Sequence, residues 1–291
     1  MNINGIEIKD NLDVLVIVGP TASGKTALSI ELAKKLNGEI ISGDAFQVYK
    51  NMDIGTAKVS IDEMDGIDHH LIDIVDYDYE YDVSIFQKMA REKISEIKKR
   101  KKLPIIAGGT GLYIKACLFE YEFEHDPKLK ETQEFLNTKD LSFLQDYCKD
   151  NNIKLNNSEI NNHKHLVNIV AKNMLNISNN KKGNIPHYKN FQIICINVDR
   201  EVLYDRINKR VDEMFQAGLV DEVKLFKPGF MSQLAIGYKE IHNSMDDLDY
   251  ARHMIKQNSR NFAKRQVSWF SNQMEIEHYK RNGDIWQLHN N

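Results

Sequence analysis

The feature that most constrains this fold is the stretch VGPTASGKTALSIELAKKL at residues 18–36. Residues 19–26 fit the pattern G-x-x-x-x-G-K-[ST], in which glycines allow backbone amides to approach phosphate oxygens. The apolar run LDVLVIV precedes the pattern, and Leu28, Leu32 and Leu36 repeat every four residues after it. The run is typical of a strand buried on both faces, and the repeat is typical of a helix. The sequence therefore predicts a strand, a phosphate-binding loop and a helix in succession.

This loop predicts a site for a phosphate chain and Mg²⁺. The Lys25 ammonium can neutralise a phosphate oxygen, the Thr26 hydroxyl can ligate Mg²⁺, and the helix start adds partial positive charge. The loop alone leaves open whether the chain hydrolyses ATP, transfers a phosphoryl group or binds another diphosphate. The predicted loop residues are Gly19, Pro20, Thr21, Ala22, Ser23, Gly24, Lys25 and Thr26.

Strands and helices alternate along most of the chain. Further strands are expected at residues 39–42, 103–107 and 191–198, and a helix at 84–100. This alternation predicts an α/β fold, a P-loop NTPase-like parallel sheet core flanked by helices. After residue 199 the pattern is helical almost to the end.

Residues 120–189 have a different character from the rest of the chain. They are polar and rich in Asn and Lys, and only 131–135 and 166–175 have a helical pattern. We therefore expect a small helical insertion domain at 120–189, within a catalytic core formed by 1–119 and 190–291.

Composition restricts the possible environment and partners. The net charge of −3 gives no global attraction to nucleic acid, so an RNA partner would need a local basic patch. The three cysteines are far apart and predict neither a metal site nor disulfides. The sequence shows no signal peptide and no apolar run near the ~20 residues of a membrane span. We expect a cytoplasmic protein without membrane contact, and a monomer.

Several further motifs have a specific order. Asp44 stands just after a predicted strand, where open α/β sheets place their sites, although a turn residue explains its position equally well. After the phosphate loop come SGDAFQVYKNMDIGTAK, HHLID and AGGTGLYIKA, and later DREVLYDRINKRVDEM, GLVDEV, IGYKE and QNSRNFAKRQVSWF. With these motifs the chain resembles the tRNA dimethylallyltransferases, also called tRNA isopentenyltransferases.

The resemblance implies a particular activity. The family transfers a dimethylallyl group from dimethylallyl diphosphate to the exocyclic amine of an adenosine beside the tRNA anticodon, with Mg²⁺, and releases pyrophosphate. It implies that Lys25, Thr26 and Arg210 stabilise the leaving diphosphate, and that Asp44 takes the proton from the amine. It further implies contacts with tRNA by Thr110 and by the block Asp44, Ala45, Phe46 and Gln47. From the residues alone, Arg210 reads as a solvated helix residue, Phe46 as a core aromatic, and Thr110 equally as a helix N-cap.

A basic stripe is expected near the C-terminus. Residues 251–270 contain no acidic residue, and four cations recur every four positions, so a helix would present them together. They are Arg252, Lys256, Arg260 and Lys264. Ala251, Ile255, Phe262 and Trp269 fall on the opposite side. Such a face suits RNA phosphates, although a solvated charged face is its usual explanation.

The insertion departs from the family pattern. It is shorter than usual, and His165 and Asn168 stand where the family has arginines that grip the anticodon stem-loop. Ala45 replaces a common serine. An adenylate isopentenyltransferase acting on free AMP or ATP is therefore an alternative. A P-loop small-molecule kinase is less favoured, because the sequence shows no lid arginine pattern and the block DAFQVYKNMDIGTAK has no role in a kinase. An RNA-binding relative without catalysis is less favoured because the expected catalytic set is intact.

Overall fold

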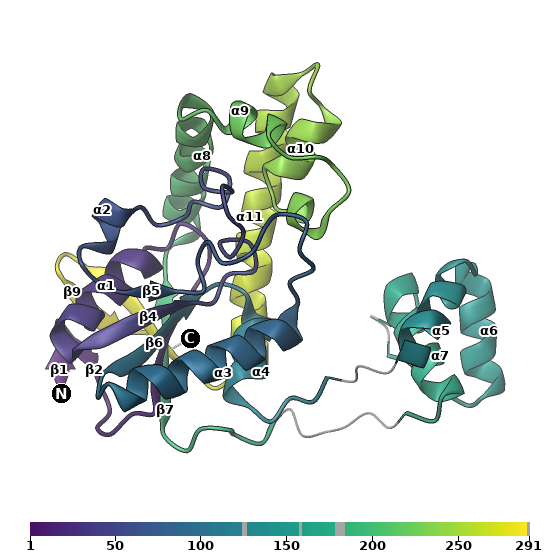
Figure 1. The fold of residues 1–291 in the computed structure, drawn as a ribbon, viewed down its shortest axis with the longest axis horizontal. Coiled ribbons are helices and arrows are strands. Elements are labelled where there is room, and N and C mark those ends of the chain that lie inside the picture. Colours follow the sequence, from purple (N-terminus) through teal and green to yellow (C-terminus); the bar gives the residue numbers. More distant parts are fainter. Residues whose placement is uncertain (124–126, 157–158, 178–183, 290–291) are drawn as a thin grey trace. The chain divides into compact units, whose positions relative to one another are not determined.

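The chain forms two compact units. The computed structural model describes residues 1–123, 127–156, 159–177 and 184–289. One unit comprises Met1–Glu120 with Pro186–Asn291, and the other comprises Tyr121–Ile185 (Figure 1). The insertion expected at 120–189 thus starts one residue before the second unit and extends four residues beyond it.

A seven-stranded sheet forms the centre of the first unit, in the order β5-β4-β6-β3-β7-β8-β9. All neighbouring strands are parallel except β8 and β9. The predicted α/β class with a mostly parallel sheet is confirmed. The strands are β3 (Val14–Val18), β4 (Gly38–Ser42), β5 (His69–His70), β6 (Leu103–Gly108), β7 (Phe191–Asn197), β8 (Glu277–Asn282) and β9 (Ile285–Leu288), with β1 (Asn2–Ile3) and β2 (Ile6–Glu7) paired separately.

Helices cover both faces of this sheet (Figure 1). Strand β3 is buried throughout because its side chains alternate between two apolar clusters. Val14, Val16 and Val18 pack with residues of α3, α4 and α11, whereas Leu15 and Ile17 pack with residues of α1. The helices of this unit are α1 (Lys25–Leu36), α2 (Ile61–Met64), α3 (Val83–Lys99), α4 (Gly111–Leu118), α8 (Arg200–Gln216), α9 (Leu219–Lys224), α10 (Tyr238–Asn243) and α11 (Leu248–Gln273), with a 3-10 turn at Met231–Leu234.

The ends of β3, β4 and β6 bring three motifs to one edge of the sheet. Because these strands are parallel, the loops that follow them all leave from the same side. The Gly43 amide donates to the Ala107 carbonyl at 2.8 Å, and the Thr110 amide donates to the Gly43 carbonyl at 3.3 Å. A Cβ on Gly108 would lie 2.4 Å from the Gly43 backbone, so the two loops meet only with glycine there.

The last strands were not predicted. The sequence suggested helix almost to the end, but α11 ends at Gln273 and the chain returns as β8 beside β7. Pairing with β7 and packing of Tyr279 and Trp286 into the core stabilise this hairpin. Strand pairing and core packing both depend on residues distant in the sequence, so the residue pattern along the chain did not predict this hairpin.

The second unit is a three-helix cluster with its own core. Its helices are α5 (Pro127–Asn137), α6 (Leu141–Asp150) and α7 (His163–Met174). Leu136, Leu144 and Leu166 are fully buried at its centre. The helical patterns expected at 131–135 and 166–175 fall within α5 and α7, apart from the last residue of the second, whereas α6 was not predicted. Among the described residues of both units, no helix is long and apolar enough to cross a membrane.

A buried carboxylate, Glu39, binds three cationic or imidazole side chains at the end of the sheet opposite to the loops that follow β3, β4 and β6. Glu39 in β4 accepts hydrogen bonds from His70 at 2.6 Å and Arg100 at 2.6 Å, and forms an ion pair with Lys102 at 3.0 Å. Burial raises the pKa of Glu39, but the hydrogen bonds from these three groups outweigh it and hold the pKa at about 2. The carboxylate is therefore ionised in the folded protein at any pH above this value.

We expect Glu39→Gln to lower the free energy of unfolding by about 2 kcal/mol at neutral pH, because charge-assisted hydrogen bonds become neutral ones. The folded pKa lies below the ordinary value of 4.5, so this contribution is complete above 4.5 and is lost as the pH falls toward about 2. Denaturant unfolding of both proteins over this range checks it. The difference between them should shrink with acid, and a constant difference would contradict the assignment.

Candidate active site

The phosphate loop lies between β3 and α1. Gly19 and Gly24 have φ angles of 152° and 95°, which favour glycine. Gly24 is the N-cap of α1 and offers no side chain to the first amides of the helix. The hydroxyl of Ser23 is buried and has no hydrogen-bond partner within the described ranges. These donors suit an anion, because a phosphate oxygen would satisfy them.

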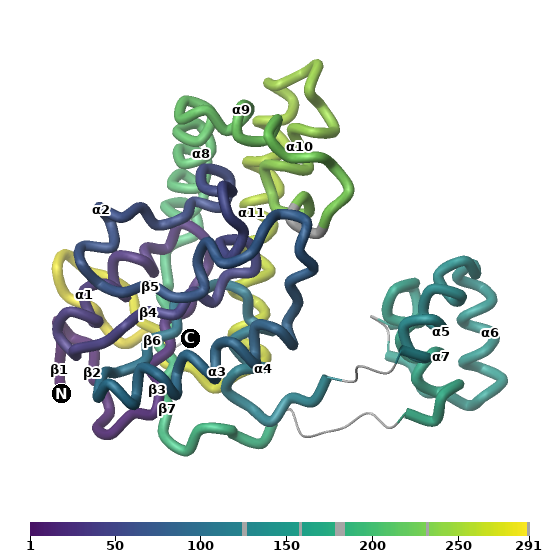
Figure 2. The backbone as a smooth tube through the Cα atoms, in the orientation of Figure 1, coloured from purple at the N-terminus to yellow at the C-terminus, as the bar shows by residue number. Residues whose placement is uncertain are grey.

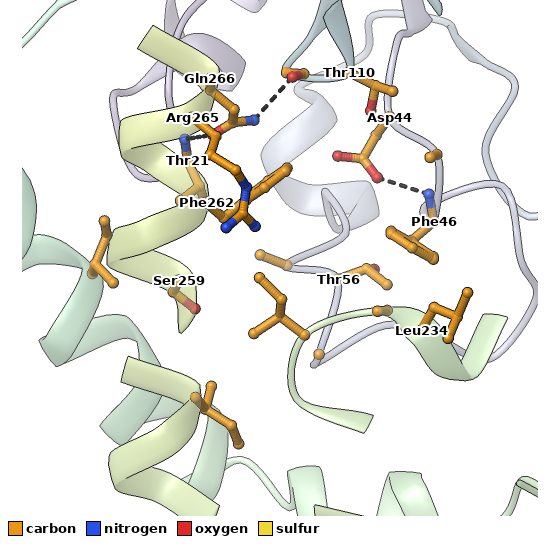
Figure 3. Close-up of a pocket in the computed structure, with 18 of the residues that line it drawn as sticks. Thr21, Asp44, Phe46, Thr56, Thr110, Leu234, Ser259, Phe262, Arg265 and Gln266 are labelled. Carbon is orange, nitrogen blue, oxygen red and sulfur yellow. Dashed lines mark hydrogen bonds between the residues drawn. The ribbon is translucent and has the colours of Figure 1, made fainter. Parts of the chain in front are cut away.

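A pocket of ≈ 470 Å³ opens beside this loop (Figure 3). One part of its wall is apolar, formed largely by side chains of α8, α11 and the segment before α10. They include Ile207, Val211, Met214, Ile236, Ile255 and Phe262. Polar groups converge on the remaining wall, among them Thr21, Asp44, Thr110, Arg210, Arg265 and Gln266. An apolar pocket with a few polar groups is the usual form of a site for a small organic group.

Asp44 is held by its own turn and points into the pocket (Figure 3). Its Oδ1 accepts the backbone amides of Phe46 at 2.8 Å and Gln47 at 3.3 Å, as expected of a turn residue, and its role in catalysis stays a prediction. Burial raises the pKa of Asp44, against the two amides and the attraction of Lys25. A fixed, partly desolvated carboxylate with a raised pKa is suited to accept a proton.

Lys25 is electrostatically coupled to two residues of the pocket. Its ammonium donates to the Pro20 carbonyl at 2.7 Å. Burial lowers the pKa of Lys25 to about 8, Asp44 opposes this, and Arg210 adds to it. Lys25 and Thr26 are not among the residues that line the pocket, whereas Thr21 of the same loop is. The loop therefore borders the pocket, with positive charge from Lys25 and Arg210 near the junction.

Arg210 is half-buried and lines the pocket, so the interpretation as a solvated helix residue is wrong. Burial lowers the pKa of Arg210, and the charges of Glu213 and Glu63 oppose this. Thr110 is the N-cap residue of α4, but its hydroxyl makes no capping hydrogen bond. It also lines the pocket and faces the same space as Asp44 (Figure 3).

The block at residues 44–47 divides into two parts. Ala45 and Phe46 line the pocket with Asp44, and Phe46 also packs against the main core. Gln47 is not among the lining residues. Its Oε1 accepts from the Ser42 hydroxyl at 3.1 Å, and its Nε2 donates to two backbone carbonyls of the loop at 56–57. Its observed contacts are thus internal, and its contact with RNA stays a prediction.

Sequence reasoning gave Gln266 no role, yet it joins two parts of the site. Its Oε1 accepts the Thr21 amide at 2.8 Å, and its Nε2 donates to the Gly109 carbonyl at 3.0 Å (Figure 3). It lies on the buried side of α11 between Ala263 and Phe270. A glutamine at a buried position of an amphipathic helix was the signal that could have identified it, because buried polar groups need partners.

Close packing of α11 also explains two glycines of the motif AGGTG. A Cβ on Gly109 would lie 2.1 Å from the Gln266 amide nitrogen, and a Cβ on Gly111 would lie 2.1 Å from the Trp269 ring. The helix can approach the loop after β6 only because both positions lack side chains. The sequence therefore specifies the contact between this loop and α11.

The basic stripe is not a free face, contrary to expectation. The Arg252 guanidinium lies over the Phe215 ring at 4.5 Å, Lys256 pairs with Asp212 at 2.7 Å, and Arg260 donates to Asn208 at 2.6 Å. All three partners belong to α8, against which α11 packs. Lys264 is exposed. The stripe thus holds two helices together, and contact with RNA stays a prediction for these four residues.

No cluster of three potential metal-ligating His, Cys, Asp or Glu side chains occurs in the described part of the chain. His69 and His70 belong to β5, where His70 bonds Glu39 and His69 bonds the Ile67 carbonyl at 2.9 Å. The three cysteines are buried, and burial raises the pKa of Cys117 and Cys195 to about 12. The role of Thr26 as a Mg²⁺ ligand stays a prediction.

Comparison with known proteins shows independently which family the chain is similar to. The family model described as IPP transferase matches residues 47–273. The tRNA dimethylallyltransferase of Macrococcus caseolyticus is 46% identical over 92% of this chain and 90% of its own length. That of Bacillus licheniformis is 41% identical over 90% of this chain and 89% of its own length.

Solved structures give the same result. The tRNA isopentenylpyrophosphate transferase of Staphylococcus epidermidis is 40% identical, with a TM-score of 0.69 and 92% of both chains covered. A eukaryotic dimethylallyltransferase acting on tRNA is 26% identical, with a TM-score of 0.76, covering 92% of this chain and 73% of that one. The match of sequence and fold over nearly the whole chain shows that the protein belongs to the IPP transferase family.

Proposed function

We propose that this protein transfers a dimethylallyl group from dimethylallyl diphosphate to the exocyclic amine of an adenosine beside the tRNA anticodon. The observation that carries the proposal is the junction of a phosphate-binding loop with an apolar pocket that contains the Asp44 carboxylate. Relatives with 41–46% identity are named for the same transfer to tRNA, which favours tRNA over the alternatives. The cytoplasmic location and the monomeric state stay predictions.

The donor fits the junction of loop and pocket. Its diphosphate suits the loop amides, Ser23, Lys25 and Arg210, and its five-carbon group suits the apolar wall. As the carbon–oxygen bond breaks, negative charge grows on the leaving diphosphate. Fixed cations and amides stabilise this charge more strongly than that of the bound donor, and so lower the barrier.

The acceptor fits the part of the pocket near Asp44. The adenine amine is a weak nucleophile because its lone pair is delocalised into the ring. Asp44 would orient the amine with a hydrogen bond and take its proton as the carbon–nitrogen bond forms. Phe46 supplies an aromatic face beside this position, and base stacking on such a face is common in RNA recognition.

Mg²⁺ fits the donor set of this site. Thr26 is exposed on the first turn of α1, where its hydroxyl can serve as one ligand. Mg²⁺ usually keeps several waters and takes its remaining ligands from one or two protein groups and substrate phosphates, so one hydroxyl suffices. When bound, the ion would neutralise charge on the diphosphate.

Binding of the donor should weaken as the pH rises through about 8. Burial lowers the pKa of Lys25 to about this value, so the free protein loses the ammonium charge above it and keeps the charge below it. Calorimetric titration with dimethylallyl diphosphate from about pH 6 to about pH 9.5 measures the effect. Lys25→Arg is the matched variant, because a guanidinium stays charged over this range and should remove the alkaline loss. The same loss in both proteins would exclude Lys25 as its origin.

One experiment tests the proposed function. The protein is incubated with radiolabelled dimethylallyl diphosphate, Mg²⁺ and either unmodified tRNA, AMP or ATP. Label in tRNA supports the proposal, and label only in a free nucleotide would favour the adenylate enzyme. ATP turnover without prenyl transfer would favour a kinase or an ATPase. Binding of tRNA without any transfer would indicate a relative that has lost catalysis.

A further inference from the structure

Glu222 is a buried carboxylate whose two oxygens are both fully used. Its Oε2 accepts the backbone amides of Asp53 at 2.9 Å and Ile54 at 2.7 Å. Its Oε1 accepts the Gly55 amide at 3.0 Å and the Tyr238 hydroxyl. One side chain of α9 therefore fixes three successive amides of a loop that lies 167–169 positions earlier in the sequence. In Figure 2 this loop is in dark blue, and its amides meet Glu222 of α9.

The next residues of the same loop form a wall of the pocket. Gly55, Thr56 and Ala57 line it, and Thr56 lies near Phe46 and on the side away from Thr21 (Figure 3). This is the side of the pocket assigned above to the acceptor base. The position of the wall is thus decided by whatever holds the loop.

Two side chains, Gln47 and Glu222, anchor this wall of the pocket. Gln47 Nε2 donates to the carbonyls of Thr56 and Ala57, each at 3.3 Å, and so joins the loop to the turn that carries Asp44. Glu222 joins the same loop to α9, and through Tyr238 to α10. The distance between Asp44 and the pocket wall formed by α8 and α11 therefore depends on the hydrogen bonds that Glu222 accepts from the loop.

Tyr238 fits closely beneath the loop. A Cβ on Gly55 would lie 2.4 Å from the Tyr238 ring, so only glycine allows the ring to pack there. Burial, and then the hydrogen bond to Glu222, raises the pKa of Tyr238, which keeps its hydroxyl protonated as a donor. Residues of the motifs DIGTAK, GLVDEV and IGYKE thus contact one another directly in the folded protein.

We infer that Glu222, supported by Tyr238, is a positioning residue that sets the loop at residues 53–57 against the acceptor base. The inference rests on the proposed function, because it assumes that a base occupies this side of the pocket. Glu222 does not itself line the pocket. It acts through the backbone that it holds. The phosphate loop on the other side of the pocket is held separately, by the hydrogen bond from the Thr21 amide to Gln266.

Glu222→Gln tests the inference with nearly unchanged shape. A glutamine offers one oxygen where the carboxylate offers two, so at least one loop amide loses its acceptor. We expect the KM for unmodified tRNA to rise about tenfold and the Kd for dimethylallyl diphosphate to change less than about twofold. Tyr238→Phe keeps the three amide bonds and removes one donor, and should give a smaller shift in the same direction.

Glu39→Gln is the matched control, because it makes the same change at a buried carboxylate near the start of β4, at the opposite end of the sheet from the Asp44 turn. It should lower the melting temperature without changing the KM for tRNA. Equal losses of donor and acceptor binding in Glu222→Gln would overturn the inference, and so would an unchanged KM. If Glu222→Gln does not fold, Tyr238→Phe decides by the same criterion. Absence of transfer by the unmodified protein would instead count against the proposed function.

Discussion

Asp44→Asn is expected to lower the rate constant for prenyl transfer by about a hundredfold to ten-thousandfold, the range that a general base contributes. Asparagine has nearly the same shape, and its oxygen can still accept the amides of Phe46 and Gln47. The turn should therefore persist while the proton acceptor is lost. Single-turnover transfer of radiolabel to tRNA measures the rate without interference from product release.

The donor should still bind to this variant, because the phosphate loop is a separate segment. We expect its Kd for dimethylallyl diphosphate to stay within about threefold of that of the unmodified protein. Asp76→Asn is the control, since Asp76 is exposed and its side chain pairs with Lys50 at the surface. Transfer at a near-normal rate by Asp44→Asn would show that another group takes the proton.

The acid side of the rate profile offers a further check on Asp44. Burial raises its pKa above the ordinary 3.8, and the base must be ionised to act. The rate should therefore fall as the pH decreases through this raised value. The fall should be absent from the residual activity of Asp44→Asn.

Lys25→Met is expected to have the second large effect. It removes the cation of the phosphate loop and keeps a side chain of similar length. We expect kcat/KM for dimethylallyl diphosphate to fall about a thousandfold, because the lost charge would stabilise both the bound diphosphate and, more strongly, the leaving group. Initial rates at varied donor concentration and saturating tRNA measure this ratio.

The KM for tRNA in Lys25→Met shows whether Lys25 acts on the donor or on the acceptor. The KM for tRNA should remain nearly unchanged, because Lys25 does not line the acceptor side of the pocket. Lys35→Met on the same helix is the control, since Lys35 is exposed and pairs with Glu31. A loss confined to tRNA binding, or an equal loss in Lys35→Met, would contradict the assignment.

The sequence by itself determined the phosphate loop and the strands that precede the loops of this site. A phosphate loop needs glycines at fixed positions and a buried strand before it, and both are local features. The Asp44 turn also forms locally, since its carboxylate bonds amides only two and three residues away. The order of the remaining motifs identified the family, because each stands at a definite place along the chain.

Only the tertiary structure decided which faces of the C-terminal helices are free. The four-residue spacing of Arg252, Lys256 and Arg260 placed them on one stripe correctly. It could not show that α8 covers this stripe, because the partners Asp212 and Asn208 lie about 50 positions earlier. Gln266 and Glu222 escaped notice for the same reason. Apart from the Tyr238 hydroxyl, their partners are backbone groups more than 150 positions away, and a sequence pattern records side-chain types but no distant backbone groups.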